Sequence, residues 1–508
     1  MNYTSLYVIC GYLVILLLLG VFSSRFFRGT SSDFFVASRS IGPFMLLMSV
    51  FGTTMTAFAL VGSTGKAYTT GIGVYGLMAS WSGLIHSAVF FLIGIRLWAI
   101  GKRYGYVTQC QYFRDRFESP MLGYLLFPIL VALIIPYLLI GLLGAGAVMR
   151  GLTMGMFPEA FAGTNGAIPP WLTSLIICSV VLTYVFLGGV RSTAWANTFQ
   201  TLVFMVTGVI AFFMIAKAMG GLQDATGLVK EHSPQHLARE GMIGKAQFLT
   251  YMFVPLSVGM FPHLFQHWLT ARSAKSFRLT VVFHPLCIAV VWVPCILIGI
   301  WAAGSPAINL PAAKANAVIG VMVKTLVESP FLSGLLTAGI LAAIMSSLDS
   351  QFMCIGTMFT NDIVARLMPV ESLTDRQKLW VGRAFVVAIV LVTYLFSLSN
   401  PRKVFELGVW CFSGFGSLFP MVFASVYWKR STKFGAIACV ITTATVWFLL
   451  FARADFGAAA EHDSLVWGMM PVAIIFAASC IAMVLGSLVS RPPSETVLKK
   501  FFPVFPSK

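Results

Sequence analysis

The sequence predicts an all-α integral membrane protein with about 13 transmembrane helices. Hydrophobic residues make up 58% of its 508 residues, and the mean hydropathy is +0.88. Charged residues make up only 10%, against about 25% in soluble domains. A soluble globule must present polar surface to water, so the composition excludes a soluble enzyme, a disordered scaffold and a nucleic-acid-binding module.

Thirteen apolar runs are long enough to be transmembrane helices, because about 20 helical residues cross a hydrocarbon core about 30 Å thick. They are 5–24, 43–66, 73–99, 121–149, 170–188, 193–218, 247–269, 279–303, 330–364, 379–398, 404–428, 433–452 and 466–490. An odd number of crossings places the two termini on opposite sides of the membrane. The longest polar stretches between the runs, 219–246 and 304–329, are too short to form a soluble domain.

The basic residues predict the orientation. With the N-terminus outside, 23 of the 34 Lys and Arg residues fall in cytoplasmic segments, which is the usual bias of membrane proteins. The net charge of +17 therefore reflects the cytoplasmic face and not a nucleic-acid partner. We expect a multi-pass protein of a cell membrane (inner or plasma membrane), surrounded by the lipid bilayer, with its C-terminus in the cytoplasm.

Asp349 is the one carboxylate near the centre of a predicted span, 330–364. A lone carboxylate there costs several kcal/mol, so it should face a cavity, an ion or a partner. Ser346 lies three residues earlier on the same helix face, next to Ser347. Hydroxyl oxygens suit a hard cation such as sodium. The alternative is a structural Asp that is protonated or hydrogen-bonded within the protein.

The span 43–66 contains residues that disfavour a continuous helix. Thr53, Thr54 and Thr56 lie at its middle, next to Gly52. Such a segment suits a broken helix whose freed carbonyls bind an ion and whose half-helix end faces a substrate. The alternative is a kinked helix that packs through small residues.

The span 247–269 has a corresponding weakness, with Pro255, Ser257, Gly259 and Pro262. The two interrupted spans are the second and the seventh, so each begins a set of five. This arrangement predicts a core of two inverted five-helix repeats whose first and sixth helices are broken. The chain then divides into 1–42 (an extra helix and a cytoplasmic loop), 43–218 (first repeat), 247–428 (second repeat) and 433–508 (two C-terminal helices and a cytoplasmic tail).

His263 and His267 lie one helical turn apart on the second interrupted span. They could bind a metal or relay protons in a redox protein, but no third ligand is evident. Polar residues that line a cavity are the favoured interpretation. No nucleotide-binding or hydrolase motif occurs in a suitable context, so we expect no enzymatic activity.

Five short motifs carry a family resemblance. They are Asp33-Phe34-Phe35-Val36-Ala37 with Arg39, Gly188-Gly189-Val190-Arg191 with Trp195 and Gln200, Ala342-Ala343-Ile344-Met345-Ser346-Ser347, Thr360-Asn361-Asp362-Ile363, and Gly382-Arg383. Over nearly its whole length the chain resembles the sodium/solute symporter family, which has the leucine-transporter-like inverted-repeat fold.

The resemblance implies a sodium site between the first and eighth core helices. Its ligands would be the backbone carbonyls of Gly52, Met55 and Ala343 and the hydroxyls of Ser346 and Ser347. Sodium would be the coupling ion, and no cofactor or other metal is implied.

The sequence departs from the family at Asn197. Relatives with a second sodium site, and the sugar symporters, usually have an Asp two residues after the Trp that corresponds to Trp195. We hypothesise that Asp349 supplies the missing charge from the eighth core helix, which makes Asp349 and Asn197 an auxiliary cation or proton site.

The substrate is less well indicated. Thr54, Ala59 and Ser82 replace the polar set of the bacterial sodium/galactose symporter. The segment from Gly259 to His263 resembles the proline and organic-acid branch, whose proline transporter has an Asp in place of Thr54. The candidates for the substrate cavity are Thr53, Thr54, Thr56, Ser82, Ser257 and His263.

We therefore predict sodium symport of a small polar organic solute, such as an amino acid or a carboxylate, by alternating access. The alternatives are a proton-coupled transporter of the same fold that uses Asp349, and a sugar-type sodium symporter. A solute sensor is disfavoured because no signalling domain follows Leu485. The oligomeric state stays open.

Overall fold

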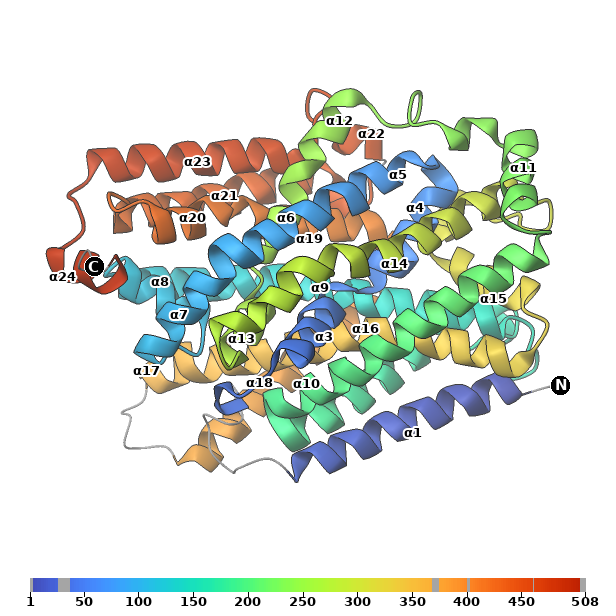
Figure 1. Cartoon of the computed structure of the whole chain (residues 1–508), viewed down its shortest axis with the longest axis horizontal. Helices are drawn as coiled ribbons and strands as arrows, with labels where there is room; N and C mark the ends of the chain where they lie inside the picture. Colours follow the sequence, from blue (N-terminus) through green and yellow to red (C-terminus); the bar gives the residue numbers. More distant parts are fainter. Residues whose placement is uncertain (1–2, 26–36, 368–373, 400–402, 460, 503–508) are drawn as a thin grey trace.

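The computed structural model describes residues 3–25, 37–367, 374–399, 403–459 and 461–502. Apart from two isolated bridges, this part of the chain is helical and contains no strand. Most of the long helices run along the long axis of the molecule, with α1 beginning near one end of that axis and α24 lying at the other (Figure 1). The predicted all-α class is confirmed.

The first half of the chain contributes a peripheral helix and a group of core helices. Their bounds are α1 (Thr4–Ser24), α3 (Pro43–Thr54), η2 (Phe58–Gly62), α4 (Ser63–Thr70), α5 (Gly73–Tyr75), η3 (Gly76–Ser80), α6 (Trp81–Val89), η4 (Phe90–Gly94), α7 (Ile95–Tyr104), α8 (Gln109–Arg116), α9 (Pro120–Thr153) and α10 (Pro170–Ala218). The start of α9 follows common capping rules, because the Ser119 hydroxyl accepts from the Leu122 amide at 3.3 Å and Pro120 fills a position that needs no amide.

The second half repeats the pattern of a broken helix followed by long helices. Its elements are α11 (Leu222–His232), α12 (Lys245–Thr250), η7 (Tyr251–Gly259), α13 (Pro262–Thr270), α14 (Phe277–Gly304), α15 (Val318–Leu326), α16 (Pro330–Met358), η10 (Phe359–Val364), α17 (Ala365–Leu367), α18 (Asp375–Leu398), α19 (Val404–Ser417), α20 (Phe419–Tyr427), α21 (Lys433–Arg453), α22 (Glu461–Ser464), α23 (Pro471–Val489) and α24 (Glu495–Phe501). Short 3-10 helices lie in the connections: η1 (Ala37–Arg39), η5 (Ala162–Thr164), η6 (Pro234–Leu237), η8 (Ala274–Ser276), η9 (Ala312–Ala317) and η12 (Asp455–Gly457).

Both segments that disfavour a continuous helix are bent in the structure. The chain turns by 57° between α3 and η2–α4, and by 51° between α12–η7 and α13. At the first bend Met55 has an extended backbone (φ −89°, ψ 91°), and the Thr56 hydroxyl accepts from the Phe58 amide at 3.0 Å, which caps the second half of the helix. At the second bend Pro262 begins α13, where its missing amide costs no hydrogen bond.

The helix α10 covers two of the predicted spans, 170–188 and 193–218. It has 49 residues, which is about 74 Å at 1.5 Å per residue and too long for one crossing. Gly189 interrupts it with φ 59° and ψ −150°, a conformation that glycine adopts readily. The described residues contain up to 12 candidate spans when each bent pair is one, and the predicted number of about 13 counts α10 as two.

Candidate functional site

The bend after α3 lies against the middle of α16. The Ser346 hydroxyl is 2.8 Å from the Gly52 carbonyl oxygen and 2.9 Å from the Ala343 carbonyl oxygen. Ser346 and Ala343 are fully buried. Three of the five predicted sodium ligands are therefore in direct contact, and they come from helices almost 300 residues apart in the sequence.

The other two predicted ligands adjoin this contact. The Ala59 amide donates to the Thr56 carbonyl at 2.9 Å, so the following helical turn leaves the Met55 carbonyl out of its hydrogen-bond ladder. The Ser347 hydroxyl donates to the Ile344 carbonyl of its own helix at 2.9 Å. It would have to turn away from that carbonyl in order to ligate an ion.

Gly52 is required for the close approach of α3 to α10. A Cβ at this position would collide with the Thr201 hydroxyl, which donates to the Met48 carbonyl at 3.0 Å. This packing holds the Gly52 carbonyl in place at the bend.

Asp349 is fully buried and surrounded by hydrogen-bond donors. The Tyr184 hydroxyl of α10 donates to its Oδ2 at 2.9 Å, and the Ser350 hydroxyl donates to its Oδ1 at 3.0 Å. The Asn197 side chain lies beside them, and with its nitrogen turned towards the carboxylate it donates to both Asp349 oxygens at 2.9 and 3.0 Å. The structure thus brings the two residues of the predicted auxiliary site together, with Tyr184 and Ser350 as partners that sequence spacing did not indicate.

The two histidines of α13 have different surroundings. His267 Nε2 is 3.0 Å from the Ser350 hydroxyl, so it joins α13 to α16 beside Asp349. His263 is fully buried, and neither ring nitrogen has a hydrogen-bond partner among the described residues. Within that part of the chain, no three His, Cys, Asp or Glu side chains form a group that could hold a metal ion.

An aromatic group connects the bend after α3 to the bend before α13. His263 stacks on Phe261 with ring centroids 5.1 Å apart and meets Tyr137 of α9 edge-on at 5.5 Å. Phe412 of α19 contacts Phe261 at 5.5 Å and Phe58 at 4.9 Å. Sequence reasoning missed these aromatic residues, because aromatic residues in apolar spans normally form ordinary core.

The remaining candidates for the substrate cavity are two threonines of α3 and two serines, one in η7 and one in α6. The Thr53 hydroxyl is buried without a hydrogen-bond partner among the described residues, whereas the Thr54 hydroxyl lies 2.8 Å from the Phe51 carbonyl and 3.3 Å from His284 Nε2. Ser257 in η7 and Ser82 in α6 are both buried. Among the described residues, Ser82 forms no hydrogen bond with the other candidates.

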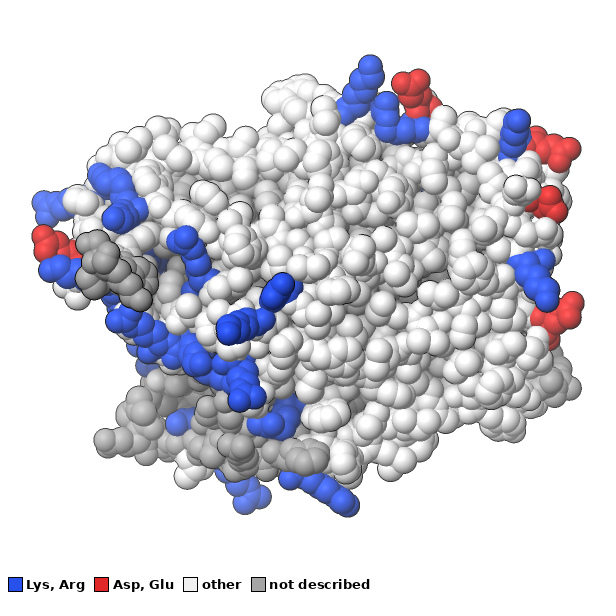
Figure 2. All heavy atoms as spheres, viewed as in Figure 1, with Lys and Arg blue, Asp and Glu red and all other residues white. Residues whose placement is uncertain are grey.

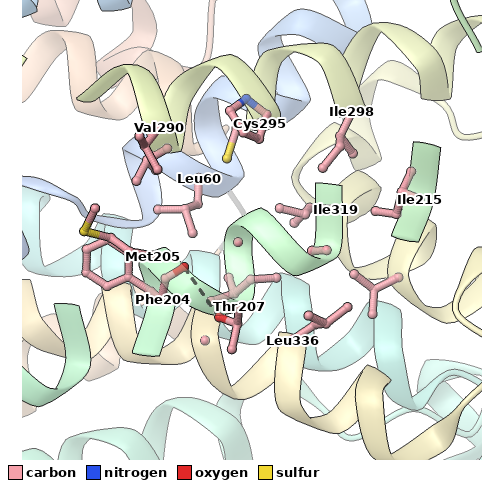
Figure 3. Close-up of a pocket in the computed structure, with 17 residues that line it drawn as sticks. Leu60, Phe204, Met205, Thr207, Ile215, Val290, Cys295, Ile298, Ile319 and Leu336 are labelled. Carbon is pink, nitrogen blue, oxygen red and sulfur yellow. Dashed lines mark hydrogen bonds between the residues drawn. The ribbon is translucent and has the colours of Figure 1, made fainter. Parts of the chain in front are cut away.

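A separate cavity lies between α10, α14, α15 and α16 (Figure 3). Its volume is about 30 Å³ and its lining is almost wholly apolar, while the Thr207 hydroxyl at its edge is bonded to the Val203 carbonyl at 2.8 Å. It is too small and too apolar for an organic solute with polar groups.

Two motif residues outside the bends, Arg39 and Asp362, form hydrogen bonds near helix ends. Arg39 donates to the Tyr106 carbonyl at 2.8 Å, and Asp362 accepts from the Thr108 hydroxyl at 2.9 Å, which ties η10 to α8. Gln200 is fully buried in α10. Asp33 to Val36 of the first motif lie outside the described residues.

Comparison with known proteins agrees with this geometry. The model of the family "Sodium:solute symporter family" matches residues 34–443. The sodium/proline symporter of Escherichia coli (strain K12) is 24% identical, with 97% of this chain and 94% of that protein covered. The sodium/pantothenate symporter of the same strain is 23% identical, with 86% and 89% covered.

Solved structures share the fold. A Na+-coupled sialic acid symporter in a substrate-bound, outward-open state superposes with a TM-score of 0.75 at 19% identity, covering 97% of this chain and 99% of that one. MhsT in complex with L-phenylalanine gives 0.56 at 13% identity, covering 91% and 99%. The chain belongs to the sodium:solute symporter family, whose members are transporters and not enzymes, and its function is sodium-coupled symport of a solute.

Proposed function

We propose that the protein moves a small organic solute that carries a carboxylate, together with sodium, through the core formed by the two bent helices. The contact between Ser346 and Gly52 across the α3 bend carries this proposal, because it joins a hydroxyl and a carbonyl oxygen at the family's expected ion position. Proline, pantothenate and sialic acid, which appear in the names of the similar proteins, all contain a carboxylate.

The proposed sodium site consists of the carbonyls of Gly52, Met55 and Ala343 and the hydroxyls of Ser346 and Ser347. In the present arrangement the Ser346 proton points to a carbonyl oxygen. A sodium ion between these oxygens would replace that hydrogen bond with ion–oxygen contacts and fix α3 against α16. An ion that binds one arrangement of the helices more tightly shifts the population towards it.

The solute is proposed to bind between the two bends. The starts of η2 and α13 place positive helix-dipole ends at the two bends, which suits a carboxylate. Thr53, Thr54, Thr56 and Ser257 would provide hydroxyls, and Ser82 would extend the cavity at α6. His263 would donate a hydrogen bond, with the surrounding aromatic rings packing on the solute's apolar part.

Asp349 and Asn197 are proposed as the auxiliary cation site. The carboxylate has only neutral donors around it among the described residues, and a buried charge without an opposite charge is costly. A second cation would supply that charge. The proton-coupled alternative would instead place a proton on Asp349, and it predicts uptake that depends on pH and not on sodium. The names of the similar proteins favour sodium.

Transport is proposed to move the segments 43–99 and 247–303 together against the remaining helices, within the repeats 43–218 and 247–428. The extra helix of 1–42 and the helices of 433–508 would flank this core. The N-terminus would lie outside a bacterial plasma membrane and the C-terminus in the cytoplasm. Lys and Arg side chains gather at the end of the molecule that holds the C-terminus (Figure 2), which supports this orientation.

The experiment that tests the ion site is thermal unfolding of the purified protein in sodium against potassium at equal ionic strength. Sodium at about 100 times its Kd should stabilise the wild type by about 2.7 kcal/mol, and Ser346→Ala should abolish the effect. Ser479→Ala is the matched control, because Ser479 is also buried but bonds Thr443 between α21 and α23. No sodium effect in the wild type, or an equal effect in Ser346→Ala, would contradict the proposal.

A further inference from the structure

A cavity of about 360 Å³ lies away from the bent helices, at the end of the molecule where basic side chains gather (Figure 2). Three connections form it: the link from α8 to α9, the start of α21, and the link from α23 to α24. Its polar lining residues are Arg116, Glu118, Ser431, Thr432, Lys433, Arg491 and Ser494. Its lining therefore contains three cations and one carboxylate.

The carboxylate is already engaged. The Ser494 hydroxyl and amide donate to the two Glu118 oxygens at 2.6 and 3.2 Å. No described carboxylate forms an ion pair with Arg116, Lys433 or Arg491. The cavity thus has an excess of positive charge.

Arg116 is fully buried and held in a fixed position. Its Nε donates to the Ser425 carbonyl at 2.8 Å and its Nη2 to the Ser431 hydroxyl at 2.7 Å. Its Nη1 is buried without a hydrogen-bond partner among the described residues. Burial lowers the pKa of Arg116, and the opposing effects of Tyr112 and Glu118 are smaller. A buried guanidinium with a free donor is suited to an oxyanion.

An apolar surface adjoins the cavity. Phe434 is next to Lys433 at the start of α21, and Leu488 and Val489 end α23 just before Arg491; all three side chains are more than half exposed. The helices α21 and α23 pack against each other and are both long and apolar enough to span a membrane, and these side chains are exposed at the ends of the two helices. The start of α21 adds a positive helix-dipole end at Thr432.

From this arrangement we infer that the cavity is a binding site for a phosphate-bearing anion, with Lys433 and Arg491 at its mouth and Arg116 at its base. A basic pocket between membrane helices is a typical binding site for the head group of an anionic phospholipid, and the apolar surface beside it would take the acyl chains. A free phosphate would use the same cations without that surface.

The test measures binding of phosphatidylglycerol to the detergent-purified full chain by native mass spectrometry, with phosphatidylcholine as the zwitterionic comparison. The double variant Lys433→Gln/Arg491→Gln should lose about 30-fold in affinity for phosphatidylglycerol, equivalent to about 2 kcal/mol at about 1 kcal/mol per basic residue. The matched control Lys429→Gln/Lys499→Gln removes two charges from the same end without touching the cavity lining and should change affinity less than about threefold.

Thermal unfolding with inorganic phosphate distinguishes the sources. A stabilisation by millimolar phosphate that the double variant loses would support the anion site with a soluble phosphate as its ligand, whereas stabilisation by phosphatidylglycerol alone would support the lipid. Equal losses in both double variants, or no preference for phosphatidylglycerol over phosphatidylcholine, would overturn the inference. Both double variants retain Arg116, whose removal would leave buried carbonyls without a donor.

Discussion

Asp349 and Asn197 face each other from two helices, and we expect that the charge of the proposed auxiliary cation site can be supplied from either position. Their side chains are in hydrogen-bond contact, so a carboxylate on either one would face the same space. Asp349→Asn should raise the sodium concentration for half-maximal uptake about tenfold or more, because about 1.4 kcal/mol of ion binding is tenfold in affinity. The charge-exchanged variant Asp349→Asn/Asn197→Asp should recover most of this loss. Sodium titration of uptake in proteoliposomes is the measurement, and an Asp349→Asn variant with unchanged sodium dependence would contradict the auxiliary site.

Gly52 provides a second prediction at the scale of one residue. Gly52→Ala places a Cβ against the Thr201 hydroxyl, and overpacking of this kind typically costs about 1–3 kcal/mol. The double variant Gly52→Ala/Thr201→Ala removes the colliding atom and should regain part of the stability, as measured by thermal unfolding. If Thr201→Ala does not restore the stability lost in Gly52→Ala, the close packing of α3 on α10 is not the reason for glycine at position 52.

Among the helices, an ion pair joins α4, the second half of the first broken helix, to α19. Lys66 Nζ is 3.8 Å from Glu406 Oε1, with the two side chains 4% and 16% exposed, and the ammonium also lies 5.2 Å from the Phe405 ring centroid. Loss of one partner from a buried pair costs about 3 kcal/mol or more, so Glu406→Gln should lower the unfolding temperature clearly. Glu495→Gln breaks the exposed pair with Lys499, at 3.4 Å, and should cost at most about 0.5 kcal/mol. Similar effects of the two variants would show that the Lys66 pair is screened by water.

The sequence predicts the helices and their bends better than it predicts the contacts between helices. Gly52 with three threonines, and Pro262 after Gly259, identify both bends because these residues disfavour a continuous helix whatever surrounds them. The cluster at Asp349 is different. Spacing along one helix relates Ser346 to Asp349, but Tyr184 and His267 become their neighbours only when α10 and α13 pack on α16. The aromatic group at His263 is hidden for the same reason, because apolar spans are rich in such residues in any case.

At the scale of the whole molecule, the number of cations in each transport cycle determines how uptake responds to voltage. A solute with one negative charge and one sodium ion together move no net charge. If the Asp349 site carries a second sodium ion, each cycle moves one net positive charge. An inside-negative potential of 100 mV then adds about 2.3 kcal/mol per net charge, or about 50-fold in the accumulation ratio. We expect this voltage response in the wild type and its loss in Asp349→Asn, measured with a potassium diffusion potential in proteoliposomes.

Ser479→Ala should keep the wild-type response, because the Ser479 hydroxyl forms hydrogen bonds within the α21–α23 pair. A response that persists in Asp349→Asn would place the second charge elsewhere, and the hydrogen bonds around Asp349 would then serve only to hold α10 and α16 together.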